Sequence, residues 1–142
     1  MNKRLKRQAG VTLIEMMVVV TIIALFAALV LPKMMHQAER ARNTAAHAQI
    51  NAYLTALGSY KLDTGVFPTT EQGLQALRQK PEGVENWQGP YLQKEIENDP
   101  WHHPYVYHYP GDHGDEPDIV SLGADGAPGG DGDNADIVSW KN

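Results

Sequence analysis

Four histidines of this 142-residue chain lie close to two aspartates, and side chains of these types hold transition metals or transfer protons. They are His102, His103, His108 and His113, with Asp99 and Asp112 nearby. Adjacent residues of an extended strand point to opposite faces, so His102 and His103 would not share one site. The set offers no nucleophile with a base and an orienting group. We therefore predict that the chain is not an enzyme.

A second set of candidate ligands lies in the glycine- and aspartate-rich segment from Leu122 to Asp136. Calcium takes about six to eight oxygen ligands from carboxylates and carbonyls, and this composition supplies both. The spacing does not match an EF-hand. From the residues alone, a calcium loop and a metal-free turn are both open. The chain has no cysteine, which excludes disulfides, thiol catalysis and zinc sites built on cysteine.

Glu15 is the only charged residue in the apolar run from Val11 to Leu31. A carboxylate within a membrane span is costly unless it is partnered, and it usually marks a functional position. One interpretation is a charge at the membrane edge that reaches the interface. The other is an ion pair with a positive charge at the same depth, such as a free α-amino group created by cleavage after Gly10 on a neighbouring copy.

The apolar run itself meets the length of roughly 20 residues that a membrane-spanning helix needs. Four basic residues precede it within the first seven positions: Lys3, Arg4, Lys6 and Arg7. The positive-inside rule places this end in the cytoplasm and sends the remainder outward. The small residues Ala9 and Gly10 come before the apolar run, whereas a secretory signal is cleaved after it. Cleavage there would remove the charges and keep the helix.

The charge balance excludes a basic surface of the kind that binds nucleic acid. Twelve Lys and Arg stand against seventeen Asp and Glu, for a net charge of -5. Between Glu95 and Asp136 there are eleven carboxylates and no Lys or Arg. We therefore expect no nucleic-acid partner.

The pattern of apolar residues predicts one long helix from Val11 to Leu62, with a capping glycine at Gly65. Pro32 removes one helical donor, which predicts a kink or local melting there. Beyond it the helix becomes amphipathic and contains a row of alanines and a set of bulky residues that we assign to one stripe. The alanines are Ala38, Ala41, Ala45, Ala48 and Ala52, and the bulky residues are Ile50, Tyr53, Leu54 and Leu57.

The remaining chain predicts a small α+β domain over residues 36–142. Thr69 and Gln72 have the spacing of a capping box and open a short helix that ends before Pro81. Alternating or β-branched residues predict three strands, 105–109, 118–122 and 136–140. The fold class is therefore a long N-terminal helix, with a transmembrane half and an amphipathic half, packed on a small antiparallel sheet with a C-terminal metal-binding loop.

The amino-terminal residues Lys-Arg-Gln-Ala-Gly10, followed by Val-Thr-Leu-Ile-Glu15, resemble the class III signal of type IV pilins and pseudopilins. The resemblance implies a cleaved leader over residues 1–10, with cleavage between Gly10 and Val11 by a prepilin peptidase and N-methylation of Val11. It also implies that residues 11–35 form a transmembrane helix that becomes the filament core. Glu15 would then neutralise the terminal amine of an adjacent subunit. Val11 departs mildly from the phenylalanine that is usual at this position.

The carboxyl half resembles the major pseudopilins of type II secretion systems. The matching residues are Asp99-Pro100-Trp101, Pro104-Tyr105, Tyr107, Pro110-Gly111, His113-Gly114, Asp118-Ile119, Ser121, Gly123-Ala124-Asp125-Gly126, Gly129-Gly130, Ala135-Asp136-Ile137 and Trp140. This family binds calcium in the corresponding loop, which implies ligands at the Leu122 carbonyl and Asp125, with Asp133 preferred over Asp131 as the second carboxylate. His102 departs from the glycine that commonly follows Asp-Pro-Trp.

The resemblance implies a structural subunit of the secretion pseudopilus, anchored once in the bacterial inner membrane with its globular domain in the periplasm. Copies would polymerise into a helical periplasmic filament that drives export of folded proteins. The implied partners are the prepilin peptidase, the minor pseudopilins and the inner-membrane assembly platform. The alternatives are a minor pilin-like subunit of an adhesion or DNA-uptake filament, and a lone anchored calcium-binding module, which would leave Glu15 and the cleavage site unexplained.

Overall fold

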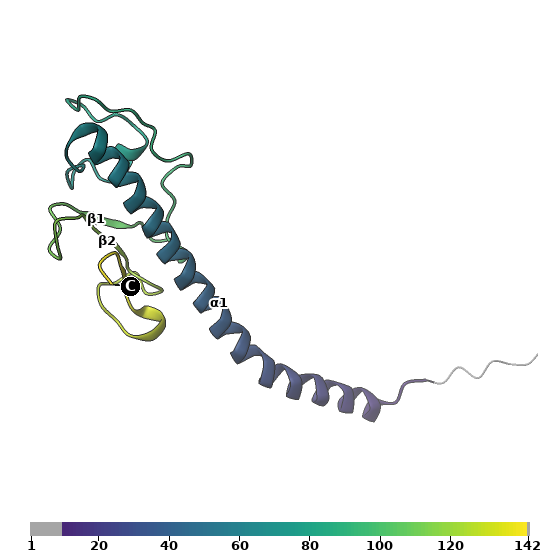
Figure 1. Ribbon diagram of the computed structural model, residues 1–142. Coiled ribbons are helices and arrows are strands. Elements are labelled where there is room, and N and C mark those ends of the chain that lie inside the picture. Colours follow the sequence, from purple (N-terminus) through teal and green to yellow (C-terminus); the bar gives the residue numbers. More distant parts are fainter. Residues whose placement is uncertain (1–9, 142) are drawn as a thin grey trace, which may run out of the picture. The chain divides into compact units, whose positions relative to one another are not determined.

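The computed structural model describes residues 10–141 of the chain. The rest of the predicted leader, residues 1–9, lies outside the described residues. These described residues form one long helix, two short 3-10 helices and three strands. Figure 1 labels the long helix and the first two strands. Two compact units divide at residues 38 and 39, and the second unit contains the whole sheet.

The long helix α1 runs from Leu13 to Thr64. Its start is capped by Thr12, whose hydroxyl accepts the N–H of Glu15 at 3.2 Å. Its end is closed by Gly65, which has a φ of 86° and donates its N–H to the Lys61 carbonyl at 2.8 Å. The predicted C-terminal cap is therefore confirmed. The helix continues without interruption through Pro32, so the local melting predicted there is wrong.

The first part of α1 is exposed and, apart from Glu15 and Thr21, almost entirely apolar. It holds an 18-residue window with a mean hydropathy of 2.8, none of which is buried within the chain. By length and composition this segment is long and apolar enough to cross a membrane.

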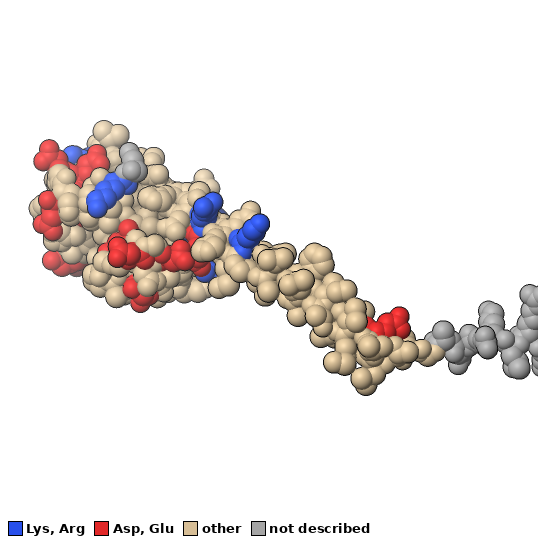
Figure 2. Space-filling model, turned by 90° about the horizontal axis from the view of Figure 1, so that it is seen from below, with Lys and Arg blue, Asp and Glu red and all other residues tan. Residues whose placement is uncertain are grey.

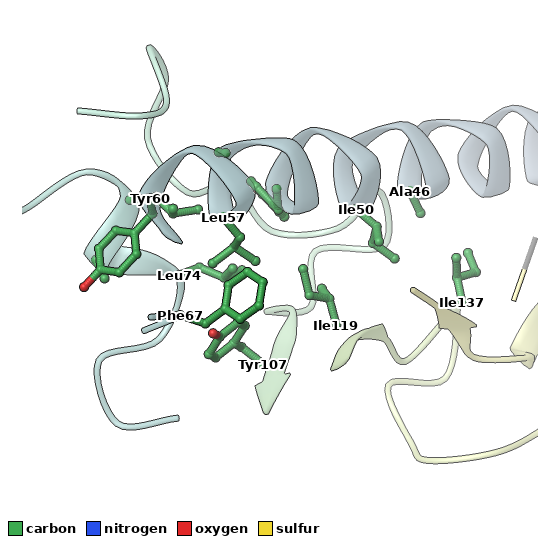
Figure 3. Packing of buried hydrophobic residues seen from close by; sticks show 13 residues of the cluster. Ala46, Ile50, Leu57, Tyr60, Phe67, Leu74, Tyr107, Ile119 and Ile137 are labelled. Atoms are coloured by element: carbon green, nitrogen blue, oxygen red, sulfur yellow. The ribbon is translucent and has the colours of Figure 1, made fainter. Parts of the chain in front are cut away.

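The core of the second unit forms on one face of α1. Ile50, Tyr53, Leu57 and Tyr60 repeat at intervals of three or four residues and are nearly fully buried. They pack against Phe67, the 3-10 turn and the sheet, as Figure 3 shows. The alanine row, by contrast, is exposed on another face of the helix. Our assignment of the alanines and the bulky residues to a single stripe is therefore wrong: the two sets follow helical spacing but lie at different angles around the helix axis.

The sheet consists of β1 (Val106–His108), β2 (Asp118–Ser121) and β3 (Ile137–Val138), which are antiparallel and adjacent in chain order. Each strand lies within a predicted one but is shorter. Ile119 pairs with Tyr107, and Ile137 pairs with Ser121. Tyr107, Ile119 and Ile137 point into the core, so the sheet covers the buried face of α1.

The capping box predicted at Thr69 and Gln72 is present. The Gln72 side chain accepts the Thr69 N–H at 3.0 Å, and the Thr69 hydroxyl accepts the Gln72 N–H at 3.3 Å. The helix that follows is only the 3-10 helix η1, Leu74–Leu77. A second 3-10 helix, η2, covers Gly132–Asn134 within the glycine- and aspartate-rich segment.

Two tyrosines of the sheet region fix the domain through their hydroxyls. Tyr107 donates to the Pro68 carbonyl at 2.8 Å, and Tyr105 donates to Gln49 of α1 at 2.6 Å. Burial raises the pKa of both phenols far above the ordinary value of 10.0. Both hydroxyls therefore stay protonated donors at neutral pH.

Candidate functional site

The amino-terminal candidate site consists of Gly10, Val11 and Glu15, all exposed. No atom of the described residues lies within 4 Å of the position that a Cβ of Gly10 would take. Glu15 lies in the first turn of α1, where the helix dipole favours a carboxylate. Among residues 10–141 no cationic group forms an ion pair with it. In the view of Figure 2, the described apolar part of the helix shows acidic atoms near its start and no Lys or Arg beside them.

The second candidate site is the loop from Leu122 to Asp136, which joins β2 to β3. The loop folds back on itself: Ala124 donates its N–H to the Asp133 carbonyl at 3.4 Å. Gly123 has a φ of 64°, and a Cβ there would lie 2.9 Å from the Ala135 carbonyl oxygen. The two ends of the loop therefore meet closely, and a glycine is required at the contact.

The predicted carboxylates of this loop occupy different surroundings. Asp125 is exposed, and its Oδ1 accepts the N–H of Ala127 at 3.1 Å. Asp131 and Asp133 are also exposed, and their carbonyls take part in the loop's main-chain hydrogen bonds. In the described part of the chain, no three His, Asp or Glu side chains converge as a metal-binding group. The structure therefore places the three aspartates in one loop without bringing their carboxylates together.

Asp136 is a carboxylate that our sequence analysis did not name as a ligand. Its Oδ2 accepts the N–H of Gly129 at 2.8 Å, across the loop. Its Oδ1 is buried and has no hydrogen-bond partner among the described residues. A buried carboxylate oxygen without a partner is destabilising, and a bound cation would satisfy it. The spacing along the sequence does not mark Asp136, because its burial depends on the loop folding back so that the Gly129 N–H reaches it.

Asp99, considered above as a metal ligand, accepts hydrogen bonds inside the fold instead. It is 2% exposed. Its Oδ1 accepts the main-chain N–H groups of Trp101 and His103 at 3.0 and 2.8 Å. Its Oδ2 accepts the hydroxyl of the fully buried Ser121 at 2.5 Å. These donors satisfy the buried carboxylate and tie the Asp99–His103 turn to the end of β2.

Three of the four histidines near Asp99 and Asp112 have side-chain partners, and these partners are separate. His103 bonds to the Gly123 carbonyl, and His108 is an exposed residue of β1 facing Thr70. His113 stacks on Trp140 with ring centroids 3.7 Å apart and lies 2.8 Å from an oxygen of Asp118. They therefore do not form one site in the described structure.

Comparison with known proteins identifies the family of the chain. The family model described as "Type II secretion system (T2SS), protein G" matches residues 33–140. A prokaryotic N-terminal methylation motif matches residues 5–31. This chain belongs to the type II secretion system protein G family.

Relatives in this family cover nearly the whole chain. The type II secretion system core protein G of Pseudomonas aeruginosa is 46% identical over 140 residues, which is 96% of this chain and 98% of the relative. The protein of the same name from Vibrio cholerae is 45% identical over 142 residues, covering 98% and 96%. The crystal structure of the major pseudopilin of enterohaemorrhagic Escherichia coli is 33% identical with a TM-score of 0.63, covering 77% of this chain and 95% of that one.

These matches confirm the resemblance stated from the sequence and the pilin-like fold of a long helix packed on a small antiparallel sheet. They favour a major pseudopilin over a minor pilin-like subunit of another filament, because the relatives compared are named core protein G and the solved structure is a major pseudopilin. A protein G pseudopilin is a structural secretion subunit, and its family is not an enzyme family.

In this pseudopilin, His102 occupies a backbone position that favours glycine. Its φ is 72°, in the left-handed region where a side chain is unfavourable. We expect His102→Gly to raise the free energy of unfolding by about 1 kcal/mol, because relief of strain outweighs the added chain entropy of glycine. Urea denaturation measures the change. The control is His47→Gly on exposed, helical α1, which we expect to destabilise by about 0.3–0.5 kcal/mol. Equal destabilisation in both variants would contradict the strain at His102.

Proposed function

We propose that this chain is the filament-forming subunit of a type II secretion pseudopilus, processed after Gly10 and methylated on Val11. The observation that carries the proposal is the joint match of the N-terminal methylation motif and the protein G domain along one chain. The precursor is held in the inner membrane by the apolar part of α1, with the globular domain in the periplasm. Growth of the filament, powered by another component of the machine, drives folded proteins outward.

Assembly follows from the exposed apolar surface of the first part of α1. Large side chains such as Leu13, Ile14 and Phe26 expose 64–80% of their surface in the single chain. In the membrane, lipid covers this surface, and in a filament the same segments of neighbouring copies cover it. Burying such side chains is favourable by about 1.5–3 kcal/mol each relative to water. A subunit that leaves the membrane therefore has to pack its helix against other copies.

Glu15 selects the axial position of the incoming subunit. Removal of the leader creates an α-amino group at Val11, four residues before Glu15. The amine and the Glu15 carboxylate both lie at the start of the same helix. In our proposal, the amine of one copy pairs with the Glu15 carboxylate of a neighbouring copy. An ion pair in an apolar interior is strongly favoured over either charge alone. This pairing sets the register between neighbouring helices. The other partners that the proposal requires are the prepilin peptidase, the minor pseudopilins and the assembly platform.

The oxygen atoms of the loop from Leu122 to Asp136 support the proposal that it binds a calcium ion. The buried Oδ1 of Asp136 has no hydrogen-bond partner in the described part of the chain. The Leu122 carbonyl and the carboxylate of Asp125 supply further oxygen donors. Asp133, and after it Asp131, complete the set predicted from the sequence. When bound, calcium supplies the positive charge that offsets the repulsion between these carboxylates. The chain's own contribution is to bring the two ends of the loop together at Gly123.

Processing after Gly10 can be tested directly by mass spectrometry. We expect the wild-type chain from membranes to have the mass of residues 11–142 plus one methyl group. Gly10→Val should remain full length and support no secretion, because a branched side chain blocks the peptidase. The open space around Gly10 means that the substitution leaves the fold unchanged. Gly114→Val, at another glycine in open space, is the matched control and should be cleaved normally. A wild-type chain that retains its first ten residues would overturn the proposed processing.

A further inference from the structure

His103 contacts the loop from Leu122 to Asp136 from outside it. We propose that His103 is a positioning residue for this loop and sets its affinity for calcium by holding the turn between Gly123 and Gly126. The inference rests on the calcium proposed above and adds a residue that lies outside the ligand set. It predicts that a change in the 99–103 turn alters cation binding without removing any ligand.

The first contact is a hydrogen bond to the main chain of the loop. Nδ1 of His103 lies 3.0 Å from the carbonyl oxygen of Gly123. A carbonyl only accepts, so Nδ1 must carry the proton. The Gly123 carbonyl directly follows Leu122, whose own carbonyl is a proposed ligand. Holding the Gly123 carbonyl in place limits the movement of the turn that begins at Leu122.

The second contact is the packing of the imidazole against Gly126. A Cβ at Gly126 would lie 2.9 Å from both Cε1 and Nε2 of His103, so the ring lies directly against the main chain there. Gly126 has a φ of 65°, which independently favours glycine. His103 therefore contacts the turn at Gly123 and at Gly126, on both sides of Asp125.

Two hydrogen bonds with Asp99 hold the main chain of His103 in place, and this restricts the position of its imidazole ring. Its N–H donates to Oδ1 of Asp99 at 2.8 Å, and its carbonyl accepts the Asp99 N–H at 2.8 Å. The other carboxylate oxygen of Asp99 accepts the hydroxyl of Ser121, at the end of β2. Asp99 thus links the main chain of His103 to β2, the strand that precedes the loop. Through His103, Asp99 and Ser121, the turn around Asp125 is therefore connected to the folded core.

Replacing His103 should change calcium binding without changing the folding of the domain. His103 is not a member of the buried apolar cluster, so its replacement leaves the core packing intact. The carboxylate of Asp125 is exposed, and in the absence of a brace it can move away from the other donors. Loss of partners that orient metal ligands typically costs about 10- to 100-fold in metal affinity. We expect a loss of this size when the hydrogen bond to Gly123 is removed.

The test uses two nearly isosteric variants of the processed full chain in detergent. His103→Asn places an amide N–H at the branch position of Nδ1 and keeps the donor, whereas His103→Leu fills similar space without one. Calcium chloride is titrated by calorimetry into each variant and into the wild type. We expect the Leu variant to bind calcium at least about tenfold more weakly than the Asn variant. His47→Ala, which removes an exposed imidazole of α1, should bind as the wild type does.

The outcomes separate this inference from the calcium proposal. Equal affinities in the Leu variant, the Asn variant and the wild type would overturn the role of His103 while leaving calcium binding in place. A wild-type chain that binds no calcium would overturn both. If the Leu variant does not fold, nitrogen NMR of the wild type decides: the inference requires the neutral ring of His103 to carry its proton on Nδ1, and a proton on Nε2 alone overturns it.

Discussion

Replacing Glu15 with glutamine should abolish pseudopilus assembly while leaving a folded, membrane-inserted subunit. The variant keeps the size of the side chain and removes the charge that we propose pairs with the terminal amine of a neighbour. Losing one member of a buried ion pair costs about 3–5 kcal/mol, because the remaining charge stays unpaired. This corresponds to a weakening of more than about a hundredfold at each subunit contact. Electron microscopy of sheared filaments measures assembly, and circular dichroism of the membrane form checks the fold.

The matched control for Glu15 is Thr21→Val in the same apolar segment. The Thr21 hydroxyl donates to the Met17 carbonyl within α1, so its polar group is already satisfied and needs no neighbour. We expect normal filaments from this variant. A purely local role of Glu15 at the helix start would be worth only about 0.3–1 kcal/mol and would leave assembly largely intact. Normal filaments from Glu15→Gln would therefore contradict a role of the ion pair in assembly.

Removing calcium should lower the melting temperature of the globular domain by roughly 10 to 20 °C. Calcium at about 100 times its dissociation constant adds about 2.7 kcal/mol to the free energy of unfolding. For a domain of this size each kcal/mol shifts the melting temperature by about 4–8 °C. The comparison is thermal unfolding with excess calcium and with a chelator. Asp125→Asn should unfold at the chelated temperature under both conditions.

Variants of the other aspartates identify the second carboxylate. Asp136→Asn should lose most of the calcium response, because its buried Oδ1 has no other partner in the described structure. Parallel Asp133→Asn and Asp131→Asn variants show whether the exposed residues predicted from the sequence contribute as well. Asp115→Asn, an exposed carboxylate outside the loop, is the control and should respond as the wild type does. Identical melting of the wild type with calcium and with chelator would rule out a stabilising metal.

Features set by neighbouring residues were predictable from the sequence. The capping box at Thr69 and the cap at Gly65 depend on hydrogen bonds within a few positions, and both are present. The three strands were found because their alternation is local. Their short observed lengths depend on which residues meet a partner strand, and spacing along one chain does not contain that information.

Features set by long-range contacts were missed or misread. His103 meets the Gly123 carbonyl and Asp136 meets the Gly129 N–H only after the loop has folded back on the sheet. The buried side of α1 is defined by the sheet that covers it, so a row of alanines and a row of bulky residues could be confused. Pro32 was expected to kink α1 or to melt it locally. Local melting is absent, because Pro32 removes only one donor and the turns on either side remain helical.

The most direct test of the central claim is the fate of secreted proteins when this chain is absent from the bacterium that encodes it. Deletion should leave folded exoproteins in the periplasm and deplete them from the medium, and the wild-type chain supplied on a plasmid should restore export. The Glu15→Gln chain should fail to restore it. Unchanged export after deletion, with loss of adhesion or DNA uptake instead, would contradict the account and assign the chain to another filament.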